Sequence, residues 1–319
     1  MPVVINYVWL GARPLGALEK FNIYSWRALG HTVAIYVDTF VPFTPRTNYL
    51  SDLGLEEGDA LVYDLRLTIL GKDEVNVTQK NETQTPRALL SKTRAVLLKW
   101  LKAVSKDRPP GQDQLYNMID LAKSYIGGTQ RGIVLDLKVG PSQHVAAYDA
   151  CFQTKFVSYT RGGTTAGLPE NQCMGTMQES PNLRAEYAAA FDRGVSSNKL
   201  EEVDCTQKWF DLITGFHGRA FKTTQRNIDV ATKPPDESLP LENFKVFEIG
   251  ATSHGPFRVF KKASDQTNKA GSSTTKKDVR FLCEDVWRKE LAKLKNNGGD
   301  TGFLEKVENA LQELRGDSP

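Results

Sequence analysis

The chain has 319 residues, of which 40% are hydrophobic and 25% are charged, a composition typical of a globular protein with a sizeable core. Its 41 basic and 38 acidic residues leave a formal net charge of +3, and this near balance argues against a nucleic-acid-binding protein, which needs a concentrated basic face. No apolar stretch reaches the roughly 18 residues of a membrane span, and the first residues lack the basic start of a signal peptide. We therefore expect a cytoplasmic protein, or an effector that is exported from the cytoplasm.

The N-terminal part of the sequence alternates between strand and helix patterns. Val3–Leu10 is an almost continuous apolar run, the pattern of a parallel strand that is buried on both faces. We expect a helix over Pro14–Trp26 and a second strand over Thr32–Val37, which together indicate the start of a parallel α/β sheet. The segment 41–85 has prolines early and a polar tract late, and it predicts irregular structure.

The middle of the chain predicts two helices and a strand. The first helix covers about Pro86–Val104, and the second covers 112–126, has one apolar face and is expected to end at Gly127-Gly128. Ile133–Val139 predicts a strand whose apolar run is interrupted by Asp136. A buried run rarely takes an acid without a partner, so Asp136 is a candidate functional residue.

The C-terminal half carries more helix than strand. Its predicted elements are strands over Phe156–Tyr159 and Phe244–Ile249, a surface loop over 263–278, and helices over Ser180–Phe191, Asp204–Phe216, 279–295 and 302–314. No internal repeat or linker is evident. We expect one α/β domain over residues 1–319, with a mostly parallel sheet, helices on both faces, and helical elaborations at about 160–235 and 278–315.

Residues that carry chemistry gather on the second predicted helix and the strand after it. Asp120 and Lys123 lie one turn apart on one polar face. Asp136 follows a strand whose carboxyl end is expected at the ligand-binding edge of an open α/β sheet, so the three residues predict a site for a polyhydroxylated, charged ligand. The alternative is a surface ion pair between Asp120 and Lys123, worth about 0.3 kcal/mol, with Asp136 paired to Lys138, Lys123 or Arg131.

Three motifs, in the same order, resemble the sugar-transferring domains of the large clostridial glucosylating toxins and related mannosyltransferase-like enzymes. INYVWLGARP followed by NIYSW resembles their I-H-x-x-W-x-G strand and the helix after it. IDLAKSYIGGTQRGIVLDLKV resembles their S-D-x-x-R…G-G-x-Y-x-D-x-D block, with eleven residues from Asp120 to Arg131 and five more to Asp136. GATSHGPF, which contains His254, resembles a later T-G-P turn. These motifs cover only a small part of the chain.

The resemblance implies a GT-A fold and an enzyme that moves a sugar from a nucleotide-sugar donor to a hydroxyl-bearing acceptor, either a small molecule or a protein. It implies that Trp9 packs on the nucleotide base, that Asp120 and Lys123 hold ribose and phosphate, and that Asp136 orients the donor sugar. The D-x-D carboxylates of the family also bind Mn²⁺ or Mg²⁺, which makes Asp136 the expected ligand if a metal binds.

The chain departs from the family pattern at two charged positions. Lys123 stands where the family has an arginine, and Lys138 stands where it has the second acid of D-x-D. A protonated lysine cannot bind a metal, but it can neutralise a diphosphate, so Lys138 and His254 are expected to stabilise the departing diphosphate. Three hypotheses stay open: a metal-independent transferase, a catalytically silent nucleotide-sugar-binding or effector protein, and a biosynthetic enzyme that takes a non-glycosyl substrate.

Overall fold

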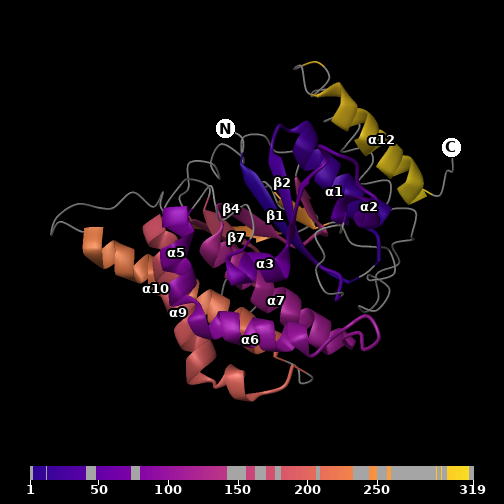
Figure 1. The fold of residues 1–319 in the computed structure, drawn as a ribbon. Coiled ribbons are helices and arrows are strands. Elements are labelled where there is room, and N and C mark those ends of the chain that lie inside the picture. Colours follow the sequence, from indigo (N-terminus) through magenta and orange to yellow (C-terminus); the bar gives the residue numbers. More distant parts are fainter. Residues whose placement is uncertain are drawn as a thin grey trace, which may run out of the picture.

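The structure is a computed structural model of the chain. It describes residues 3–11, 13–40, 48–72, 80–141, 156–161, 170–176, 181–205, 209–232, 244–249, 257–259, 292, 296 and 300–315. Seven strands in these residues form one sheet of order β3-β2-β1-β4-β7-β6-β8, and helices lie on both of its faces (Figure 1). The mixed α/β class and the mostly parallel sheet predicted from the sequence are confirmed.

The strands of the large sheet run mostly in one direction. They are β1 (Val4–Leu10), β2 (Thr32–Asp38), β3 (Leu61–Asp64), β4 (Gly132–Leu135), β6 (Phe156–Arg161), β7 (Glu170–Thr176) and β8 (Phe244–Ile249). β7 is antiparallel to its neighbours β4 and β6, and the other neighbouring pairs are parallel. β5 (Val139–Pro141) and β9 (Phe257–Val259) form a separate antiparallel pair. Because β1 and β2 lie inside the parallel part and are covered on both faces, they need apolar side chains at almost every position.

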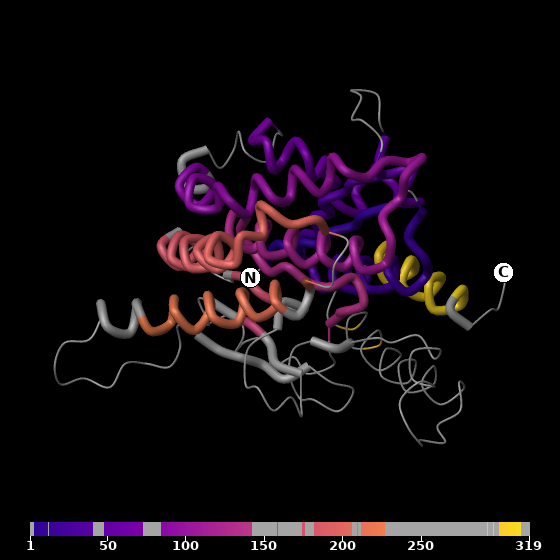
Figure 2. Tube along the Cα trace, turned by 90° about the horizontal axis from the view of Figure 1, so that it is seen from below, coloured from indigo at the N-terminus to yellow at the C-terminus, as the bar shows by residue number. Residues whose placement is uncertain are grey.

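The helices form two layers around the sheet. Their bounds are α1 (Ala17–Ala28), α2 (Tyr49–Leu53), α3 (Leu65–Leu70), α5 (Lys80–Leu89), α6 (Ser91–Lys102), α7 (Gln112–Thr129), α9 (Pro181–Ser197), the 3₁₀ turn η1 (Leu200–Glu202), α10 (Phe210–Thr232) and α12 (Thr301–Arg315). α1 and α12 lie against each other and cover one face (Figures 1 and 2). α3, α6, α7, α9 and α10 cover the other face.

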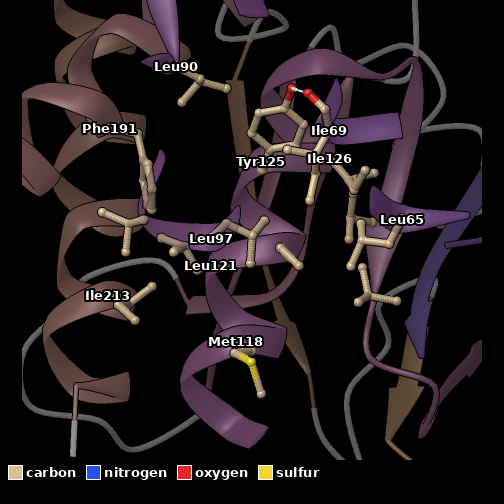
Figure 3. Packing of buried hydrophobic residues seen from close by; sticks show 14 of the residues in the cluster. Leu65, Ile69, Leu90, Leu97, Met118, Leu121, Tyr125, Ile126, Phe191 and Ile213 are labelled. Atoms are coloured by element: carbon tan, nitrogen blue, oxygen red, sulfur yellow. Dashed lines mark hydrogen bonds between the residues drawn. The ribbon is translucent and has the colours of Figure 1, made fainter. Parts of the chain in front are cut away.

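The core under α7 is the larger of the two apolar cores. Figure 3 shows how residues of four helices meet there: Leu65 and Ile69 of α3, Leu97 of α6, Leu121, Tyr125 and Ile126 of α7, and Phe191 of α9. The hydroxyl of Tyr125 donates to the main-chain carbonyl of Ile69 at 3.4 Å, so its polar end is satisfied inside the core. α7 is therefore the helix around which this layer packs.

The prediction of irregular structure over residues 41–85 is wrong for residues 80–85, where α5 begins, and for the central part, which contains α2, β3 and α3. These elements are too short to show an apolar period, and side-chain caps begin the two helices. Asp64 Oδ1 accepts from the N–H of Leu67 at 2.7 Å at the start of α3, and Asn48 Oδ1 accepts from the N–H of Ser51 at 3.4 Å at the start of α2.

The single helix expected over Pro86–Val104 is two helices, α5 and α6, separated at Leu90. Asp192 of α9 caps the second one: its carboxylate accepts from the N–H of Lys92 at 3.2 Å and from the N–H of Thr93 at 2.7 Å. This cap comes from 99 residues further along the chain, so no local pattern could reveal the break.

Two glycines lie inside α7, although the sequence predicts that Gly127-Gly128 end the helix. They allow close packing instead. A Cβ on Gly127 would lie 2.5 Å from Cε of Met174 on β7, and one on Gly128 would lie 3.0 Å from Cδ1 of Leu90. The absent side chains let α7 lie close to the sheet and to Leu90 at the break between α5 and α6, which larger residues would prevent.

The C-terminal predictions have mixed outcomes. The strands β6 and β8 and the last helix, α12, are confirmed. The helix expected from Ser180 begins at Pro181 as α9 and continues past Phe191. The helix expected over Asp204–Phe216 is α10, which begins later, at Phe210, and continues to Thr232. Residues 263–278 and most of 279–295 lie outside the described residues.

A buried acid fixes α12 to the rest of the fold. Lys306 Nζ lies 2.6 Å from Oδ1 of Asp59 and 2.6 Å from Oε2 of Glu56. Asp59 is 1% exposed, and its second oxygen accepts from the hydroxyl of Tyr24 at 3.3 Å. Leu304 of α12 enters the core beside α1, so an ion pair and apolar contacts hold the same helix.

We expect Lys306→Met to lower the free energy of unfolding by about 1–3 kcal/mol, because it leaves the buried carboxylate of Asp59 without its cation. Lys199→Met is the matched control, since Lys199 lies 3.8 Å from Glu202 with both side chains more than 60% exposed. Its effect should stay below about 0.5 kcal/mol. Urea unfolding measures both variants, and equal losses would contradict the anchoring role of Lys306.

Candidate functional site

The candidate site lies at the turn that follows β4. The strand expected over Ile133–Val139 ends at Leu135, and Val139 begins β5, so Asp136 stands in the turn between them. The N–H of Val139 donates to the carbonyl of Asp136 at 2.8 Å and closes this turn. Because β4 is parallel to β1 and pairs Leu135 with Tyr7, the turn lies at the carboxyl ends of the parallel strands, where open α/β sheets bind ligands.

Lys123 joins the two carboxylates of the predicted site. Its Nζ lies 2.8 Å from Oδ1 of Asp120, one helical turn earlier on α7, and 2.6 Å from Oδ1 of Asp136. The lysine side chain is 4% exposed, and each carboxylate side chain is 17% exposed. The structure therefore brings together three residues that the sequence places in one site, and the expected alternative of a simple surface pair does not describe a lysine this deeply buried.

The pKa values follow from this arrangement. Burial alone lowers the pKa of Lys123, but the charges of Asp120 and Asp136 raise it more, so the pKa lies above the ordinary lysine value. Burial raises the pKa of Asp136, but Lys123 and Lys138 lower it more, and the carboxyl pKa lies below its ordinary range. The lysine and Asp136 are therefore charged at neutral pH.

Lys138 is the accessible cation of the site. Its Nζ lies 3.3 Å from Oδ2 of Asp136, and 43% of its side chain is exposed. Two carboxylates and two ammonium groups, those of Asp120, Asp136, Lys123 and Lys138, make the cluster neutral as a whole. An anionic ligand therefore meets no net repulsion there, and Lys138 is able to turn toward it.

The donor set fits an internal lysine better than a divalent metal. The inner oxygens of Asp120 and Asp136 both contact Lys123, which lies where a cation that bridged them would lie. A metal ligand set needs several oxygen, nitrogen or sulfur donors around one point. Within the described residues, no three histidine, cysteine or acidic side chains are grouped in this way.

Trp9 lies on the other face of the sheet. Its ring packs with Leu135 in the core beside α1, whereas Asp136 reaches Lys123 on the α7 side. The guanidinium of Arg13 lies 4.6 Å from the centre of the Trp9 ring, and Trp9 is 7% exposed. The structure thus does not bring Trp9 together with the charged cluster, and its contact with a base stays a prediction. His254 lies outside the described residues.

One acid of the same sheet edge was missed by the sequence reasoning. Asp38 ends β2 after the apolar run TVAIYV, the same signal that singled out Asp136. Its Oδ2 accepts from Nε of Arg66 at 2.5 Å, and its Oδ1 accepts from the N–H of Phe40 at 2.7 Å. Burial raises the pKa of Asp38, and Arg66 acts against this shift. Like Asp136, it is a strand-end acid held by a cation from a helix of the α7 layer.

A buried polar group lies behind the charged cluster. His217 of α10 contacts Oγ of Ser158 through Nε2 at 2.8 Å and the hydroxyl of Tyr187 through Nδ1 at 3.0 Å. All three side chains are fully buried. Burial, together with the nearby charge of Lys123, lowers the pKa of His217 to about 3, so the imidazole is neutral at physiological pH.

Comparisons with known proteins find a likeness to solved structures. No family model matches the chain, and no curated protein matches it. Among solved structures, the chain is similar to a protein described as PaToxG Glycosyltransferase, with a TM-score of 0.40 and 12% sequence identity over 76% of this chain and 82% of that one. In the described residues, no helix is long and apolar enough to cross a membrane.

We expect Lys123→Met to lower the free energy of unfolding by about 3–5 kcal/mol, because it leaves two partly buried carboxylates without the cation between them. Lys138→Met is the control at the same site, and its half-exposed pair with Asp136 should contribute at most about 1 kcal/mol. Urea unfolding at pH 7 measures both. A smaller loss for Lys123→Met than for Lys138→Met would contradict the bridging role.

We expect His217 to make stability fall as the pH falls below about 6.5. The unfolded chain binds a proton at its ordinary pKa of about 6.5, whereas the folded imidazole stays neutral down to about pH 3. The loss is about 1.4 kcal/mol per pH unit between these values. His217→Asn removes this pH dependence. The free energy of unfolding of the wild type should therefore fall toward that of the variant as the pH is lowered from 6.5 to 5. A gap that is constant over this range would contradict the neutral, buried imidazole.

Proposed function

We propose that the chain is a GT-A-like glycosyltransferase that moves a sugar from a nucleotide-sugar donor to a hydroxyl group of an acceptor, without a metal ion. The observation that carries this proposal is the arrangement of two lysines around Asp136. Lys123 lies between Asp120 and Asp136 in place of a bridging metal, and Lys138 presents an exposed ammonium at the same turn.

The cluster suits the two parts of a nucleotide sugar. A diphosphate needs positive charge, and Lys138 supplies it as a flexible point charge. In the family pattern, a metal bound by the second acid of D-x-D supplies this charge. The sugar needs hydrogen-bond acceptors, and the carboxylates of Asp120 and Asp136 are each 17% exposed. Because Lys123 and Lys138 lower the pKa of Asp136, its carboxylate stays ionised and remains an acceptor when the donor binds.

In the proposed reaction, the bond between C1 of the sugar and the diphosphate oxygen breaks, and a new bond forms between C1 and the acceptor oxygen. The acceptor hydroxyl releases its proton to solvent, and the leaving nucleoside diphosphate takes the electron pair of the broken bond. Negative charge therefore develops on the leaving oxygen, where the ammonium of Lys138 stabilises it. His254 and Trp9 are proposed to assist at the diphosphate and the base, and Trp9 would accept a base only after Arg13 moves from its ring.

The test is titration calorimetry of the chain with UDP, GDP and their sugars, once with EDTA and once with Mn²⁺, followed by an assay for release of free UDP or GDP. Metal-independent binding with release supports the transferase. Binding without release, with every acceptor class offered, favours a silent binding protein. No binding by any of these probes would contradict the proposal, and affinity that depends on Mn²⁺ would contradict the role given to Lys123.

We expect Lys138→Gln to weaken diphosphate binding about tenfold or more, because a charge-assisted contact to phosphate is lost. As a control, Lys199→Gln removes the charge of a more exposed lysine at the N-terminal side of η1 and should leave the Kd unchanged. Calorimetry with the diphosphate that binds the wild type measures both variants. Equal affinities for wild type and Lys138→Gln would contradict a contact between Lys138 and the diphosphate.

A further inference from the structure

The turn that carries Asp136 and Lys138 is held from behind the sheet by two buried side chains. Nδ2 of Asn22, on α1, donates to the carbonyl of Leu137 at 2.6 Å. The hydroxyl of Tyr7, on β1, donates to the carbonyl of Val139 at 3.0 Å. Both bonds join segments more than a hundred residues apart and fix main-chain atoms of the turn itself.

The two donors act on a turn that is already closed. The carbonyl of Asp136 accepts from the N–H of Val139. Asn22 binds the carbonyl of Leu137, and Tyr7 binds that of Val139. The side chain of Leu137 packs against the α1 core, while Asp136 contacts Lys123 on the opposite face. The turn is thus held on both faces of the sheet, by its backbone on one face and by the Asp136 carboxylate on the other.

The local cost at Asn22 indicates that its amide serves this turn. Asn22 is completely buried, and its Oδ1 has no hydrogen-bond partner within the described residues. A buried acceptor without a partner is unfavourable, and a leucine of similar size would avoid the cost. What the amide provides, and a leucine does not, is the bond to the carbonyl of Leu137.

We propose that Asn22 and Tyr7 are positioning residues that hold the Asp136-Leu137-Lys138 turn so that the Lys138 ammonium meets the diphosphate of the donor. This inference rests on the proposed function for its ligand, and its structural part is independent of it. Neither residue touches the ligand; each acts through the main chain of the turn. The three fixed carbonyls hold the backbone from which the Asp136 and Lys138 side chains extend, and a preorganised site needs this kind of support.

The test compares Asn22→Leu and Tyr7→Phe with Asn6→Leu. Asn6 is a matched control, since it is 1% exposed and its Nδ2 donates at 2.7 Å to the carbonyl of Arg131, before β4 rather than after it. Hydrogen exchange of the Val139 amide and the rate of Lys138 acetylation by acetic anhydride, both followed by mass spectrometry, report on the turn without any ligand.

We expect both turn variants to speed exchange of the Val139 amide about five- to tenfold, the factor for one lost buried hydrogen bond, and to change the Lys138 acetylation rate, while Asn6→Leu does neither. Unchanged turn exchange in Tyr7→Phe and Asn22→Leu, or equal changes in all three variants, would overturn the inference. Tyr7→Phe keeps the ring and removes only the hydroxyl, so it remains informative if an asparagine variant fails to fold.

A second readout separates this inference from the function itself. With the diphosphate that binds the wild type as the probe, Asn22→Leu should raise the Kd about tenfold and Asn6→Leu should not. Faster turn exchange with an unchanged Kd would overturn the positioning role while the proposed function stands. If the wild type binds no nucleotide, the proposed function fails, and the exchange and acetylation measurements alone decide whether Asn22 and Tyr7 hold the turn.

Discussion

The bridge that Lys123 makes between Asp120 and Asp136 is the constraint on which the site depends. An ammonium that is 4% exposed must keep both carboxylates close, because a buried charge without partners would be strongly unfavourable. The bridge therefore ties α7 to the turn after β4 at one point. It also sets the charge of the site, since one lysine is used inside the cluster and the other, Lys138, is left at the surface.

The rest of the fold brings the ends of this bridge together. α7 lies close to the sheet because its glycines leave room for Met174 and Leu90, and its apolar side chains fill the larger core. From the opposite face, Asn22 and Tyr7 fix the carbonyls of the turn. Packing and hydrogen bonds to the main chain thus position the charged groups. Both kinds of contact keep a site rigid before a ligand binds.

Long apolar patterns made most of the sheet predictable, and long-range contacts account for most of what was not. β1, β2 and β4 follow from apolar runs, and Asp120, Lys123 and Asp136 follow from helical spacing and from the acid at the strand end. The break at Leu90 depends on a cap by Asp192, and the glycines of α7 depend on Met174, so local sequence could not reveal either. Asn22 and Tyr7 carry no local signal at all, because both partners are main-chain carbonyls in another part of the chain.

The attachment of α12 also has a consequence for how the chain matures. Lys306 binds Asp59, which precedes it by 247 residues, and Leu304 covers the same face of α1. At a synthesis rate of about 5–20 residues per second, α12 emerges about 12–50 s after the segment that it covers. During this interval the side of α1 that α12 covers in the folded chain still lacks this partner.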